Sequence, residues 1–218
     1  MMKRRAEMGK QAKKQRKLTA AEQRRKEQLE RLEADLYQQG YRKHDLTIGL
    51  VFANVMAIVL GVPILVVLYA AFFIRNTHLQ VNVGSGMLLL FLALLGLVVV
   101  HELIHGITWA IFAPSHWKAI EFGFVAKYLT PYCTCGEPLK RNQYIVGALM
   151  PTLLVGILPA MIAIFSGNVF WLVVGSVMVL GGGGDLTIIL KLLRYRSKGK
   201  DVIYMDHPYE AGVIAFER

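Results

Sequence analysis

The pentapeptide His101-Glu102-Leu103-Ile104-His105 lies inside an apolar stretch, residues 84–113, that carries no other charge. On an α-helix, residues i and i+4 share one face, so the two histidines can present ring nitrogens to one metal ion. The glutamate beside the first histidine can deprotonate a water molecule there. Zinc peptidases use this arrangement of two ligands and a general base. The stretch therefore predicts a metal site within a membrane-spanning helix.

A second carboxylate in an apolar run, Asp185, strengthens this prediction. A charged group at the centre of a bilayer costs about 2.5 to 3.5 kcal/mol, so Glu102 and Asp185 together cost about 5 to 7 kcal/mol. A bound zinc ion contributes about 10 kcal/mol or more and offsets that cost. In the alternative interpretation no metal binds. The histidines are then neutral, hydrogen-bonded core residues, and both carboxyls are protonated or paired.

The composition places the chain in the membrane class. Hydrophobic residues make up 55% of its 218 residues and charged residues only 18%. Apolar runs of about 20 residues can cross a bilayer. Four runs qualify, at residues 46–74, 84–113, 144–165 and 168–190. We expect an all-α integral membrane protein with about four transmembrane helices. The first run is too long for the core of a signal peptide, so we expect a retained span.

The placement of lysine and arginine predicts the orientation. Of these 25 residues, 14 precede residue 46, four lie between the second and third runs, and six follow the fourth run. Only Arg75 is left for the other side. The positive-inside rule then places both termini and the middle loop in the cytoplasm, and we expect a multi-pass protein of a bacterial cell membrane. The net charge of +10 is first an orientation signal.

Residues 1–45 form a basic N-terminal arm. Thr19 and Glu22 have the spacing of a capping box that opens a helix over residues 19–39. Three leucines on that helix could dock on a partner or on the membrane surface, although a solvated arm that enforces topology is the simpler interpretation. Contact with anionic lipid is the expected partner interaction. We expect no nucleic-acid binding, because no aromatic residues are interleaved among the charges.

The loop over residues 114–142 is too polar to span the membrane. Alternating apolar residues from Ile120 and the turn residues that follow predict short strands in a re-entrant or β-like loop. An exposed strand edge near a protease site can bind an extended substrate. Cys133 and Cys135 are the only cysteines. In the cytoplasm they should be reduced, and the alternative is that one lends a thiolate to the metal.

Positions along the expected helices bring the candidate ligands to compatible depths. His101 and His105 should lie roughly 12 to 18 Å below the cytoplasmic surface, and Asp185 about 9 Å below it. The four glycines at 181–184 let the fourth helix lie close to a neighbour or unwind locally. Two prolines in the third run predict a broken or kinked helix.

Asn54 and the tail motif at residues 206–208 each allow two interpretations. Asn54 lies inside the first apolar run, where it either donates a hydrogen bond between helices or lines the substrate path. The tail contains Asp206-His207-Pro208. Its position after the last span favours a capping or docking role over direct catalysis.

Five motifs follow one another along the chain. They are His101-Glu102-Leu103-Ile104-His105-Gly106, Tyr132-Cys133-Thr134-Cys135, Pro151, Gly184-Asp185 and Asp206-His207-Pro208. From residue 46 to the C-terminus, this combination resembles the putative zincin peptidase family of integral-membrane proteins. At a greater distance the layout is similar to site-2 intramembrane metalloproteases. The resemblance implies His101, His105 and Asp185 as zinc ligands and Glu102 as the general base. The Gly-Asp-Leu context of Asp185 departs from the Leu-Asp-Gly or Asn-Pro-Asp-Gly of site-2 proteases.

The sequence thus predicts a zinc-dependent intramembrane peptidase domain over residues 46–190, followed by a cytoplasmic tail over residues 191–218. The expected substrate is a membrane-anchored peptide or protein, cut near the cytoplasmic face. One alternative is a metal-binding scaffold or sensor without proteolytic activity, which has no need of Glu102 as a base. Another is an adaptor whose basic arm recruits a cytoplasmic partner. Deletion of residues 1–40 separates the adaptor, because an enzyme should largely survive that cut.

Overall fold

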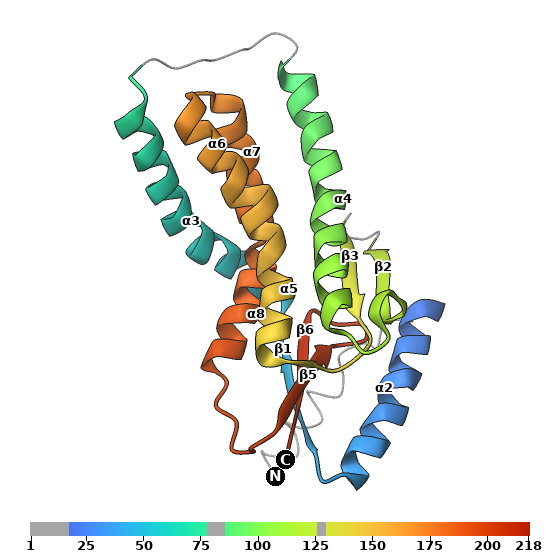
Figure 1. Ribbon diagram of the computed structural model, residues 1–218. Coiled ribbons are helices and arrows are strands. Elements are labelled where there is room, and N and C mark those ends of the chain that lie inside the picture. Colours follow the sequence, from blue (N-terminus) through green and yellow to red (C-terminus); the bar gives the residue numbers. More distant parts are fainter. Residues whose placement is uncertain (1–17, 78–85, 126–129) are drawn as a thin grey trace, which may run out of the picture.

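The chain is mostly helical, and its two β-sheets lie at one end of the helices (Figure 1). A computed structural model describes residues 18–77, 86–125 and 130–218. The helices are α2 (Ala20–Gln38), α3 (Leu50–Arg75), α4 (Gly86–Phe112), the 3-10 helix η1 (His116–Ala119), α5 (Arg141–Pro151), the π-helix η3 (Thr152–Ile157), α6 (Leu158–Ser166), α7 (Val169–Gly181) and α8 (Gly183–Arg194). The strands are β1 (Arg42–Thr47), β2 (Ile120–Val125), β3 (Thr130–Cys135), β4 (Leu139–Lys140), β5 (Val202–Asp206) and β6 (Gly212–Glu217). The basic cluster at residues 1–17, where contact with anionic lipid is expected, lies outside the described residues.

Three helical segments of the described chain are long and apolar enough to cross a membrane. They are Val51–Arg75, Met87–Phe112 and Arg141–Ser166. Helices α7 and α8 qualify together as a fourth, although they are bent by 48° where they meet. The membrane class predicted from composition is therefore confirmed. The expected four spans become three, or four if the bent pair counts as one.

Apolar side chains point outward from these spans. Ile74, Met87 and Ile111 have exposed fractions of 84%, 74% and 66%. Such a surface is unfavourable in water, where burial of apolar area drives folding, but hydrocarbon accommodates it without cost. The outward surface of α3 and α4 is thus built for lipid.

The third span continues through its two prolines. We expected Pro151 and Pro159 to break or kink it, because proline lacks a backbone N–H and crowds the preceding turn. The π-helix Thr152–Ile157 interrupts the α-helical pattern between the two prolines, as expected of a break. The run Arg141–Ser166 is nevertheless long and apolar enough to cross a membrane as one span.

The glycines at 181–184 break the fourth apolar run and bring it against two neighbours. A Cβ on Gly182 would lie 2.3 Å from the hydroxyl oxygen of Thr152, and one on Gly183 would lie 2.1 Å from the Cβ of Ala57. Helix α8 begins at Gly183, so Asp185 lies in its first turn. These glycines were expected either to allow close packing or to interrupt the helix. The structure shows both effects.

Gly183→Ala should destabilise the protein, because the new methyl group would meet both the Cβ and the Cα of Ala57. Overpacking of this kind typically costs about 1 to 3 kcal/mol. Gly181→Ala is the matched control, since a Cβ there meets no atom within 4 Å. Thermal unfolding in detergent should show a lower midpoint for Gly183→Ala only. Equal midpoints for the two variants would contradict this packing.

The larger sheet joins the two ends of the chain, and it makes the expectation of an all-α fold wrong. Its strand order is β1-β6-β5-β4, with every neighbouring pair antiparallel. Strand β1 from the N-terminal arm pairs with β6 from the tail, so that Lys43 lies opposite Phe216. Strands β5 and β6 are rich in β-branched and aromatic residues, which favour strands. Strand β1 is polar and becomes a strand through its pairing with β6.

Helix α2 covers one face of this sheet. It begins with the predicted capping box, in which the Thr19 backbone N–H donates to Glu22 Oε2 (2.8 Å) and the Glu22 N–H donates to the Thr19 hydroxyl (3.3 Å). Its buried residues Leu29 and Leu36 pack against β5 and β6. The apolar side of this helix therefore docks on the chain's own sheet.

The opposite face of the sheet packs on the ends of the membrane helices. Because side chains alternate along a strand, Val213 and Ala215 face away from α2. They join a buried cluster with Trp109 of α4, Tyr144 of α5 and Leu192 of α8. The sheet thus closes one end of the helical bundle.

The loop over residues 114–142 contains the predicted strands. Strands β2 and β3 form an antiparallel hairpin, with Ile120 opposite Cys135 and Phe122 opposite Cys133. Strand β3 lies along the second half of α4. This contact places the hairpin beside the helix turns that carry the histidines.

Candidate metal centre

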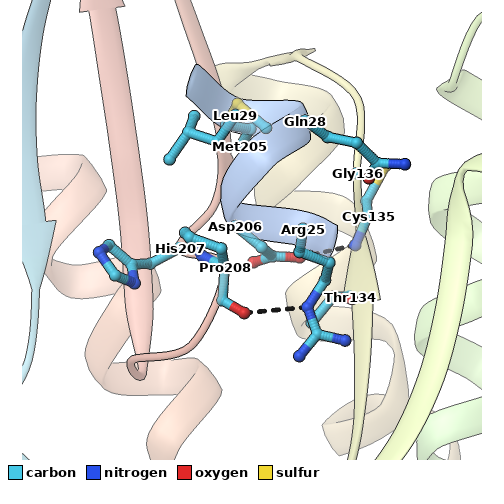
Figure 2. A pocket seen from close by; sticks show the side chains of 10 residues that line it. All are labelled: Arg25, Gln28, Leu29, Thr134, Cys135, Gly136, Met205, Asp206, His207 and Pro208. Carbon is cyan, nitrogen blue, oxygen red and sulfur yellow. Dashed lines mark hydrogen bonds between the residues drawn. The ribbon is translucent and has the colours of Figure 1, made fainter. Parts of the chain in front are cut away.

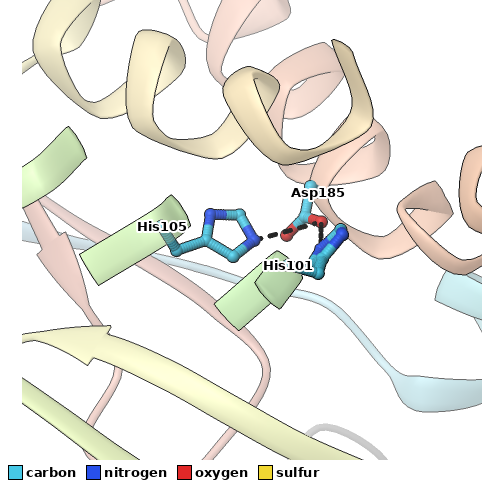
Figure 3. A group of neighbouring side chains, drawn as sticks. All are labelled: His101, His105 and Asp185. Atoms are coloured by element: carbon cyan, nitrogen blue, oxygen red, sulfur yellow. Dashed lines mark hydrogen bonds and ion pairs between the residues drawn. The ribbon is translucent and has the colours of Figure 1, made fainter. Parts of the chain in front are cut away.

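Three side chains from two helices meet inside the bundle (Figure 3). The Nε2 atoms of His101 and His105 on α4 lie 3.2 and 3.4 Å from one oxygen, Oδ2 of Asp185 on α8. The candidate ligand atoms all lie within 4.8 Å of one another. Both histidines are buried, and 23% of the aspartate side chain is exposed. The structure thus brings together the three residues predicted as ligands, and their binding of a metal stays a prediction.

His105 is held from behind by two groups. Its Nδ1 lies 2.9 Å from the carbonyl oxygen of Gly147 on α5. A carbonyl only accepts hydrogen bonds, so this contact assigns the ring proton to Nδ1. The ring also stacks on Trp109, with centroids 4.9 Å apart. The lone pair of Nε2 is therefore directed at Asp185.

A lone pair that faces a carboxylate oxygen is repelled unless a positive charge lies between the two. A second ring proton can supply this charge, and so can a metal ion. Two imidazole nitrogens and one carboxylate oxygen are ligands that zinc accepts, and catalytic zinc sites with three protein ligands leave the fourth position for water or substrate. The donor set therefore fits zinc. A metal-free ion pair between histidine and Asp185 would use the same atoms.

The start of α8 favours a negative charge at Asp185. The first turn of a helix carries unpaired N–H groups and the positive end of the helix dipole. Asp185 lies in that turn because the chain is interrupted at Gly182. The glycine run thus supplies the aspartate with its electrostatic environment as well as its position.

Glu102 lies beside the cluster and faces the same cavity. The backbone N–H of Cys133 on β3 faces its carboxylate. The predicted general base is therefore positioned both by α4, which carries it, and by the hairpin. Nothing in the pentapeptide could reveal this second contact, because the donor lies on a separate strand.

A cavity of about 540 Å³ contains the cluster and Glu102. Its volume is typical of small-molecule and cofactor sites. It is also lined by Asn54 on α3, Cys133 on β3 and Arg25 on α2. Among the described residues the Asn54 amide has no hydrogen-bond partner, which favours the interpretation that it lines the substrate path. The cavity thus runs from the membrane helices to the sheet end.

Arg25 closes the sheet end of this cavity. Its Nε donates to the carbonyl oxygen of Pro208 (2.9 Å), Nη1 to Glu121 (3.1 Å) and Nη2 to the hydroxyl of Tyr132 (3.0 Å). The bond to Pro208 is drawn in Figure 2. These bonds raise the pKa of the guanidinium against the opposing effect of its burial. One side chain of α2 therefore fastens the hairpin to the tail across the cavity.

The hydrogen-bond partners of Asp206 could not be predicted from the sequence. Its Oδ1 accepts from the buried Tyr144 hydroxyl, and its Oδ2 accepts from the Cys135 backbone N–H (2.7 Å; Figure 2). Burial raises the pKa of Asp206 to about 6, although both donors act in the opposite direction. Asp206 also lines the large cavity. The tail therefore reaches the site through this carboxylate, which corresponds to the docking role expected for the motif.

The other candidate residues stay outside the three-residue cluster within the described part of the chain. His207 lines the cavity, but its Nδ1 accepts from the Glu210 backbone N–H (3.0 Å), and burial lowers the pKa of the ring. Cys133 and Cys135 are free and buried. Burial raises the pKa of the Cys135 thiol to about 12 and raises that of Cys133 as well.

The helices and the cluster together define a class, that of helical membrane proteins with a metallopeptidase-type set of side chains. Within it, residues 94–199 match the model of the family described as "Putative zincin peptidase". The match includes His101, His105, Glu102 and Asp185, and it ends before β5. No curated protein and no solved structure matches the chain significantly. The more distant similarity to site-2 proteases stays a prediction.

Gly147→Ala should weaken metal binding about 10- to 100-fold, the usual effect of disturbing groups that orient a ligand. A Cβ at this position would lie 2.0 Å from Trp109 Nε1 and would displace the indole that stacks on His105. Gly96→Ala on α4 is the control, because a Cβ there meets no atom within 4 Å. Competition against a zinc chelator measures the affinity. An unchanged affinity for Gly147→Ala would show that Trp109 does not position His105.

Arg25→Ala should let a chelator remove bound metal several-fold faster, because three hydrogen bonds that close the cavity are lost. Arg24→Ala is the control, since the side chain of Arg24 is next to Arg25 in the sequence but is exposed. The release rate after addition of excess chelator gives the comparison. If both variants release metal at the wild-type rate, Arg25 does not limit access to the cavity.

Proposed function

We propose that the protein is a zinc-dependent peptidase that acts within the membrane on a membrane-anchored peptide or protein. The observation that carries the proposal is the meeting of His101, His105 and Asp185 in one cavity, with Glu102 beside them. The family match over residues 94–199 supports a metallopeptidase. The apolar surface around this part of the chain supports a site below the membrane surface.

In this proposal Glu102 is the general base. A zinc ion held by the three side chains would polarise the substrate carbonyl and lower the pKa of a water molecule beside it. Glu102 takes a proton from that water as the water attacks the peptide carbonyl, and it then passes the proton to the leaving amine. The Cys133 N–H keeps the carboxylate turned toward the cavity. A base held in this way is ready to accept a proton without first reorienting.

We further propose that the sheet end faces the cytoplasm of a bacterial cell and that water enters from there. The C-terminus lies at this end, as do the ends of α4 and α8 that follow the candidate ligands (Figure 1). The excess of lysine and arginine in the segments at this end supports the orientation. The cavity extends toward the same end as far as Arg25, so water would enter when the hydrogen bonds of Arg25 open.

The mode of substrate binding differs from simple strand addition to β3. Pro131 has no backbone N–H, the N–H of Cys135 is bonded to Asp206, and the N–H of Cys133 faces Glu102. An extended peptide could therefore obtain few hydrogen bonds from that edge of the strand. The lining of the cavity by Asn54 supports entry of the substrate from the side of α3 instead.

The metal content of the detergent-purified protein tests the proposal. Wild type and Glu102→Ala should each hold about one zinc per chain, because a general base is not a ligand. His105→Ala and Asp185→Ala should lose most of it. Elemental analysis gives the stoichiometry, and circular dichroism checks that each variant is folded.

A folded wild type without stoichiometric metal would overturn the peptidase mechanism and favour neutral or paired histidines. Metal that is bound by wild type, with no cleavage of any membrane-anchored peptide by wild type or Glu102→Ala, would favour a metal-binding scaffold or sensor. Zinc-dependent cleavage that Glu102→Ala abolishes would support the proposal directly.

A further inference from the structure

One edge of strand β3 faces two carboxylates. The backbone N–H of Cys133 faces Glu102, and the N–H of Cys135, two residues on and on the same edge, donates to Asp206 Oδ2 at 2.7 Å. Pro131, two residues before Cys133, has no N–H to donate. The base of the proposed reaction and an aspartate of the tail therefore hold neighbouring positions of one short strand.

Asp206 also reaches the helix that orients His105. Its second oxygen accepts from the hydroxyl of Tyr144, a side chain only 1% exposed. Tyr144 lies on α5 one turn before Gly147, whose carbonyl contacts His105. One carboxylate thus ties strand β3 to helix α5, and each of these elements orients a different residue of the site.

We propose that Asp206 is a positioning residue of the peptidase site, fixing the strand whose Cys133 N–H aims the Glu102 carboxylate. The inference rests on the proposed function, because Glu102 must be the base for its aim to matter. Asp206 itself does not contact the substrate or the metal in this scheme. It lies outside the segment matched by the family model, which ends at residue 199.

The geometry requires a carboxylate at position 206. Both partners of Asp206 are donors, so both of its oxygens must accept. Asp206→Asn keeps the size of the side chain but replaces one acceptor with an NH2 group, which then faces a donor. Either β3 or α5 loses its bond to the tail. Asp201→Asn is a matched control, because Asp201 also accepts from a tyrosine hydroxyl, that of Tyr41, but contacts neither β3 nor the cavity.

Binding of acetohydroxamate to the cobalt-loaded protein tests the inference without a substrate. This probe holds a metal ion through two oxygens and shares its proton with a carboxylate beside them, so its affinity depends on the aim of Glu102. Visible absorption of the cobalt gives the dissociation constant. Glu102→Gln and Asp206→Asn should each weaken binding about tenfold, the value of one hydrogen bond to a charged group. The double variant should also be about tenfold weaker, because both changes remove the same interaction.

Affinity for the metal alone separates positioning from a structural role. Asp206→Asn should bind cobalt as wild type does, because the Gly147 carbonyl and Trp109 still hold His105. Asp201→Asn should match wild type for both metal and probe. Losses of about a hundredfold in the double variant, or a loss of metal affinity in folded Asp206→Asn, would overturn the inference. If Asp206→Asn does not fold, Tyr144→Phe takes its place in the cycle. It should weaken the probe about threefold in the wild-type background and not in Glu102→Gln, and an unchanged affinity would overturn the inference.

The same measurements distinguish failure of the inference from failure of the proposed function. A wild type that binds neither cobalt nor the probe overturns both. The inference alone is overturned by one combination of results. Wild type binds both cobalt and the probe, Glu102→Gln binds the probe more weakly, and Asp206→Asn binds it as Asp201→Asn does.

Discussion

The contact of Asp185 with His101 and His105 is the interaction on which the rest of the structure depends. A carboxylate within an apolar bundle is costly unless a partner neutralises it, and here the partners lie on another span. Helix α8 must therefore meet α4 at one depth. The break at Gly182 starts α8 just before Asp185, and the close approach of Gly183 to Ala57 packs this start of the helix against α3. Packing and charge thus act on the same turn of the chain.

The layer outside the membrane completes the site. The sheet that joins the N-terminal arm to the tail covers the bundle end, and α2 covers the sheet. Arg25, Cys133 and Asp206 reach the cavity from this layer. Their bonds hold the base and close the cavity, while the candidate ligands come from α4 and α8. The membrane helices therefore supply the candidate metal-binding atoms. The outer layer holds the residues around them in place.

Sequence patterns predicted what is local. The apolar runs, the histidines one turn apart, the capping box at Thr19 and the alternation in the hairpin all depend on neighbours within a few residues. The larger sheet could not be predicted in this way, because the polar strand β1 acquires its partner from β6 at the other end of the chain. The same holds for Arg25, which bonds to residues 96, 107 and 183 positions away. A motif identifies atoms that can react, whereas their supports depend on tertiary contacts.

The segment matched by the family model contains only part of the candidate site. The matched segment, residues 94–199, contains every candidate ligand and Glu102. It omits Arg25 and Asp206, which close the cavity and hold the strand beside Glu102. A chain could keep the whole matched segment and still lose the aim of its base through one change in the tail. In the proposed function, metal binding and catalysis would therefore be separable, because the candidate ligands lie on two membrane helices and the proposed base also faces a strand that the tail holds.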